Sequence, residues 1–178
     1  MVIHKKGPEQ QHYDLSYDPT NTPVFRYTAA RLYHNRLLIA LQTEDGSAED
    51  SDGSGIDVVQ FENGSEFSLI HHFEMKDIRA LSLLEEEHQR YLILLKGSEE
   101  ESFSLEIFET DLDTQWTNVQ SIPIPYTDVY DFALTTQRQL YNGSQRYYLV
   151  ITRLNDRPVL CSLKSLVDQT PLEIISEI

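Results

Sequence analysis

The sequence predicts an all-β fold made of three four-stranded antiparallel blades of a β-propeller. An apolar run headed by arginine occurs three times, at 36–41, 90–95 and 146–151. The intervals between the arginines are 54 and 56 residues, which is the period of propeller blades. Each interval divides into four short apolar stretches separated by turn residues, and no segment sustains a helical period.

The predicted strands follow the same order in each blade. First strands are expected at 25–33, 78–84 and 129–135, and second strands at the three arginine-headed runs. Third strands are expected at 56–61, 104–108 and 158–163, and fourth strands at 67–73, 116–124 and 172–178. The second strands are apolar almost throughout, which is typical of strands covered on both faces. They are therefore the expected core.

The chain divides into an arm and three blades. Residues 1–22 are polar, with few apolar anchors, and predict a loose arm in which Tyr13, Leu15 and Tyr17 alternate as an edge strand does. The blades span about 23–76, 77–127 and 128–178. Closed propellers have about four to eight blades. Three blades are therefore expected to belong to a larger ring, or to complete one with a second copy or another chain.

Composition excludes several classes of partner. The chain of 178 residues has 29 acidic and 14 basic side chains and a formal charge of −15, which disfavours nucleic acid and anionic membranes. Acidic runs at 45–57, 85–87 and 99–101 interrupt the apolar stretches and indicate solvated loops. No segment predicts membrane insertion, and no secretory leader pattern follows Met1, which favours a cytoplasmic protein.

Four phrases of the second and third blades resemble the epilepsy-associated repeat, also called EPTP. The matching residues are 90–94, 104–108, 116–122 with Gln120, and 128–132. The resemblance implies a seven-bladed extracellular propeller that binds proteins and catalyses nothing. A ring of that size needs more than twice the repeats present. The glycosylation-type triplets at 63–65 and 142–144 fall in predicted turns, as a secreted protein would place them.

The acidic loop at 50–57 is the candidate metal site. Asp50, Asp52, Ser54 and Asp57 alternate with glycines, and such loops curl around Ca²⁺. The spacing of Asp57 is one residue short of integrin-type calcium loops, and the flanking helices of an EF-hand are absent from the pattern. A long solvated hairpin loop is the alternative. No other cofactor is predicted.

Aromatic residues supply the candidate partner-binding positions. Trp116, Tyr126, Tyr130 and Tyr141 lie near predicted loops of the second and third blades. Such side chains are favoured at protein interfaces. Cys161, the only cysteine, lies in a predicted strand, where a buried packing role is favoured over a nucleophilic one.

Three functions follow as hypotheses. The first is a non-catalytic protein-protein interaction module built from propeller blades. The second is a calcium-binding adhesion-type propeller that uses the loop at 50–57. The third is an enzyme with a site at the propeller centre, for which the sequence offers no convergent acid, base or nucleophile.

Overall fold

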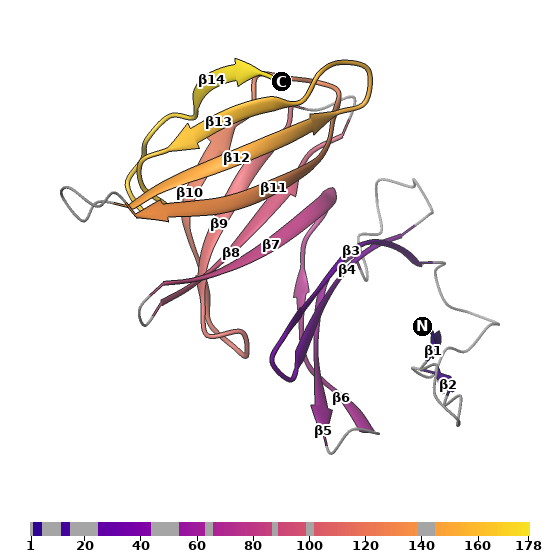
Figure 1. The fold of residues 1–178 in the computed structure, drawn as a ribbon. Helices are drawn as coiled ribbons and strands as arrows, with labels where there is room; N and C mark the ends of the chain where they lie inside the picture. The colour runs from indigo at the N-terminus through magenta and orange to yellow at the C-terminus, as the bar shows by residue number, and fades with distance from the viewer. Residues whose placement is uncertain are drawn as a thin grey trace.

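Three four-stranded sheets make up most of the computed structural model (Figure 1). It describes residues 2–4, 12–14, 25–43, 54–62, 66–86, 89–98, 102–138 and 145–178. Among these residues there is no helix, and hence no helical segment able to cross a membrane. The all-β prediction and the three antiparallel quartets are confirmed.

Each sheet is a meander in which every strand pairs antiparallel with the next one in the chain. The first sheet holds β3 (Phe25–Tyr33), β4 (Arg36–Thr43), β5 (Gly55–Glu62) and β6 (Glu66–Glu74). The middle sheet holds β7 (Ile78–Glu86), β8 (Gln89–Lys96), β9 (Ser104–Thr110) and β10 (Trp116–Pro123). The last sheet holds β11 (Val129–Arg138), β12 (Gln145–Arg153), β13 (Val159–Leu163) and β14 (Glu173–Glu177). The predicted strands are all present, and β3 has the predicted bounds.

A separate two-stranded sheet precedes the quartets. It pairs β1 (Val2–His4) with β2 (His12–Asp14), and Tyr13 lies opposite Ile3. Of the alternating residues, Tyr13 lies in a strand whose partner is β1 and not an edge of one of the larger sheets, and Leu15 and Tyr17 lie outside the described residues.

The three sheets have irregularities at matching places. One residue of the first strand is left out of the ladder near its start, namely Thr28, Arg79 and Tyr130, at intervals of 51 residues. One residue of the fourth strand is left out as well, namely Ile70, Val119 and Ile175. Such bulges bend the strand and increase its twist. The sheets therefore share a register as well as a topology.

These bulges correct the alignment of the arginine-headed runs. In each sheet, one ladder pair directly follows the bulge of the first strand. The second-strand member of this pair is Ala40 in β4, Leu95 in β8 and Thr152 in β12. Counted back from this pair, Arg36 corresponds to Tyr91 and Tyr148. Arg90 is therefore one residue, and Arg146 two residues, before the position that corresponds to Arg36, so the three arginines are not equivalent. The slip of one residue puts Arg90 on the opposite face from Arg36.

The middle sheet is covered on both faces. Leu92 and Leu94 of β8 join a core with the first sheet, and Tyr91, Ile93 and Leu95 join a core with the last sheet. All five are at most 3% exposed. Burying one such side chain contributes about 1.5–3 kcal/mol. The prediction that a second strand is covered on both faces is confirmed for β8.

Polar contacts join the middle sheet to its neighbours. The Tyr147 hydroxyl donates to Glu86 Oε2 at 2.8 Å, and Gln145 Nε2 donates to Glu86 Oε1 at 2.7 Å. Gln120 Nε2 donates to the Thr170 carbonyl oxygen at 2.9 Å. Glu85 and Glu86 belong to β7, so the interpretation of 85–87 as a solvated loop is wrong for these two residues.

Candidate functional site

The two end sheets each have a face turned away from the middle sheet. Residues paired across an antiparallel ladder share a face. Since Leu38 and Val58 pack on the middle sheet, the alternate residues form the first outer face: Leu32, Leu37, Ile39, Val59 and Leu69. By the same argument the last outer face contains Ala133, Tyr148, Val150 and Leu160.

Residues of the last outer face match buried residues of the other sheets. Counted from the first-strand bulge, Val150 corresponds to Ile93 and Leu38, which are 1% and 0% exposed. Leu160 corresponds in the same way to Ile107, which is 1% exposed. Val150 and Leu160 are only half-buried. The difference is that Ile93 and Ile107 have a following sheet to pack against.

The first outer face shows the same contrast. Leu32 corresponds to Leu83 and Leu134, which are partly buried against the preceding sheet. Leu32 itself is 66% exposed, and Leu69 on the same face is 57% exposed. Ile39 and Val59, between them, are already buried. The exposed apolar area therefore lies around a covered centre.

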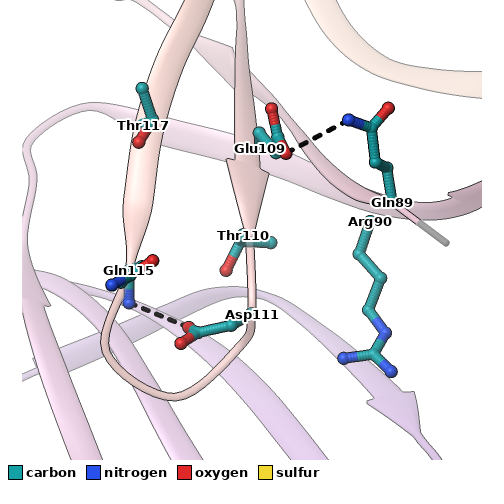
Figure 2. Close-up of a pocket in the computed structure, with 7 residues that line it drawn as sticks. All are labelled: Gln89, Arg90, Glu109, Thr110, Asp111, Gln115 and Thr117. Atoms are coloured by element: carbon teal, nitrogen blue, oxygen red, sulfur yellow. Dashed lines mark hydrogen bonds between the residues drawn. The ribbon is translucent and has the colours of Figure 1, made fainter.

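A polar pocket of about 300 Å³ lies at one end of the middle sheet (Figure 2). It is lined by Gln89, Arg90, Glu109, Thr110, Asp111, Gln115 and Thr117. Asp111 closes the turn between β9 and β10, where its Oδ1 accepts from the backbone N–H groups of Gln115, Thr114 and Asp113. Burial alone would raise the pKa of Asp111, but these three donors hold it below its usual value.

A second pocket of about 250 Å³ shares Arg90 and Asp111 with the first and reaches the first sheet. Its cations already have partners: Arg36 Nε lies 3.0 Å from Asp113 Oδ1, and Arg90 Nε lies 3.6 Å from Glu85 Oε1.

The Tyr33 hydroxyl hydrogen-bonds to Glu85 beside this pocket, and that bond raises the pKa of Tyr33 and lowers the pKa of Glu85. These contacts join two sheets and provide no paired nucleophile and base among the pocket residues.

The structure separates the predicted partner-binding aromatics. Trp116 lies between the first and middle sheets, stacked on Phe73 with ring centroids 3.6 Å apart. Tyr126 is half-buried, and the guanidinium carbon of Arg153 lies over its ring, 4.5 Å from the ring centroid. Tyr130 is 63% exposed, at the bulge of β11. Tyr141 lies outside the described residues.

The Arg153 contacts were not anticipated from the sequence. Arg153 Nε lies 2.8 Å from Asp128 Oδ1, and this hydrogen bond holds the pKa of Asp128 below its usual value. The sequence does contain a sign of this ion pair. An aspartate stands just before β11 and an arginine at the end of β12, and an antiparallel hairpin brings these two positions together.

The candidate calcium ligands are only partly described, since Asp50 and Asp52 lie outside the described residues. Ser54 is buried, and its carbonyl oxygen accepts from Met75 N at 3.0 Å. Asp57 Oδ1 lies 2.7 Å from His72 Nδ1 across the ladder between β5 and β6. No group of three potential ligands is found among the described His, Cys, Asp and Glu residues. The calcium site stays a prediction.

Cys161 is fully buried in β13, and burial raises its pKa to about 11. We expect slow reaction of Cys161 with a thiol reagent under native conditions and rapid reaction in denaturant, because the thiolate is the reactive form. Rapid native labelling would contradict the expectation.

The raised pKa of Cys161 also predicts that the free energy of unfolding is retained below pH 9 and falls as the pH rises towards 11. Urea titrations of the wild type and of Cys161→Ala at several pH values isolate this contribution.

Comparison with known proteins supplies no family assignment. No protein-family model matches the sequence, and no curated protein matches it significantly.

Proposed function

We propose that the chain is a non-catalytic protein-protein interaction module built from β-propeller blades, in which the outer faces of the end sheets are the docking surfaces. The proposal depends on one observation. Apolar residues occupy positions on the outer faces whose counterparts in the middle sheet are buried or partly buried against a neighbouring sheet. Covering an apolar sheet face that has no neighbouring sheet lowers the free energy, because apolar surface is removed from water.

Two further features support the blade arrangement. The first strand of the middle sheet, β7, contacts the first strands of both other sheets, β3 and β11 (Figure 1). In a propeller the first strands surround a central channel. Gln120, part of the phrase that resembles the epilepsy-associated repeat, joins the middle sheet to the last sheet through Thr170.

The test compares two substitutions at corresponding positions. Ile93→Asp places a carboxylate in the covered core, and we expect it to cost more than about 4 kcal/mol and to prevent folding. Val150→Asp places the same group on the last outer face, and we expect a cost of about 1 kcal/mol and a wild-type circular dichroism spectrum.

Both variants are measured as dilute, isolated chains by urea unfolding. If Val150→Asp prevents folding as Ile93→Asp does, the last outer face belongs to the chain's own core and the proposed docking surface is lost.

A further inference from the structure

We infer that the occupant of both outer faces is a second copy of this chain, which packs head to tail to close a ring of six sheets. The inference rests on the proposed function, because it names the partner of the same surfaces. Its evidence is the direction in which the three sheets stack, together with the positions of the residues left uncovered.

The stacking has one direction. The first sheet presents Leu38 and Val58 to the middle sheet, and the middle sheet presents their counterparts Ile93 and Ile107 to the last sheet. Val150 and Leu160 occupy these positions in the last sheet. The stack therefore ends on a face of the type that receives a following sheet.

The opposite end of the stack is the complementary type of face. Leu83 and Leu134 lie on the faces of the middle and last sheets that pack against the sheet before them in the chain. Leu32 occupies the corresponding position on the first outer face. One copy thus has one face of each type. Two copies related by a two-fold axis place each last outer face on the partner's first outer face, which leaves neither type uncovered.

The size of the contact is sufficient for a stable dimer. Four strands of about eight residues, at about 3.3 Å per residue and 4.8 Å between strands, present roughly 500 Å² on one face. Two junctions bring four such faces together. Because Ile39 and Val59 at the centre of the first outer face are already buried, the newly covered area is below roughly 2,000 Å², which is within the range of standard interfaces. Six blades also fall within the range of about four to eight found in closed propellers.

Charge acts against this assembly at long range. Each copy has a formal charge of −15, so two copies repel each other until salt screens them. The measurement is therefore made at about 0.15 M salt, where the screening length is about 8 Å.

The experiment is light scattering on size-exclusion fractions, at loading concentrations up to about 100 μM, well above the Kd expected of a standard-size interface. We expect a mass of twice 20.6 kDa for the wild type. Val150→Asp and Leu32→Asp, one on each outer face, are each expected to reduce the mass to 20.6 kDa. Leu154→Asp, at an exposed leucine in the turn after β12, is the matched control and is expected to stay dimeric.

Each alternative outcome is distinct. A folded wild-type monomer overturns the inference but leaves the proposed function standing, provided that Val150→Asp still folds. A dimer that survives Leu32→Asp but not Val150→Asp means that two last outer faces pack on each other, which overturns the ring. Masses that keep rising with concentration mean an open filament, which overturns closure.

Discussion

Replacing Gly55 with alanine is expected to lower the free energy of unfolding by about 3 kcal/mol, because the added methyl group has no space. A Cβ at this position would lie 2.1 Å from the Phe73 carbonyl oxygen and 2.9 Å from His72 Cε1. The oxygen belongs to the backbone of β6, so relief requires moving the strand. The corresponding position in the middle sheet is Ser104, which carries a side chain, so the restriction is local to the first sheet.

Urea unfolding followed by circular dichroism measures this change. Thr117→Ala, at an exposed strand position of the middle sheet, is the control and should stay within about 0.5 kcal/mol of the wild type. An equally small effect of Gly55→Ala would mean that β5 and β6 can separate at this point without loss.

Replacing Trp116 with alanine is expected to cost about 3 kcal/mol, because the indole fills the junction between the first and middle sheets. Its ring stacks on Phe73 at an interplanar angle of 24° and lies 6.2 Å from the Phe108 ring centroid. Truncation leaves a cavity at that junction. The measurement is again urea unfolding by circular dichroism, since Trp116 is the only tryptophan and the variant has no tryptophan fluorescence.

Trp116→Phe is the matched control. Phenylalanine keeps an aromatic ring against Phe73 and removes the indole N–H, which is buried and has no hydrogen-bond partner among the described residues. Removing an unpaired buried donor offsets part of the lost contact area, so we expect a cost within about 1 kcal/mol. If Trp116→Ala is as mild as Trp116→Phe, the indole is available to a partner, as the sequence alone suggested.

The strands were predictable because their signals are local. Alternation of apolar and polar residues, and turn chemistry such as His34-Asn35, place β3 and β4 within a residue or two of their observed bounds. Strand order followed from short connections, which favour hairpins between consecutive strands.

The register was not predictable, and the arginines show why. A bulge shifts every later pair by one residue, yet no composition signal marks Thr28 or Arg79 as the residue left out. The spacing of the arginines therefore does not show that Arg36 of the first sheet faces the middle sheet, whereas Arg90 of the middle sheet faces the first sheet.

The environments of the aromatic residues were also beyond the sequence. Proximity of Trp116 to a loop predicted an interface, but Phe73, which stacks on it, comes from another sheet and is 43 residues away in the chain. Glu86 was assigned to a solvated acidic run because its hydrogen-bond partner, Tyr147, is 61 residues away in the chain, and local sequence patterns do not reveal such a contact. Contacts between sheets depend on packing, which single-strand patterns do not encode.

The bulges in the fourth strands have a consequence for aggregation. β6, β10 and β14 are edge strands, whose unpaired backbone groups could template the addition of a foreign strand. Ile70, Val119 and Ile175 each interrupt the regular spacing of these groups, and β14 also carries Glu173 and Glu177. The self-association proposed above uses the flat sides of the sheets, whereas these bulges disfavour amyloid-like growth along the sheet edges.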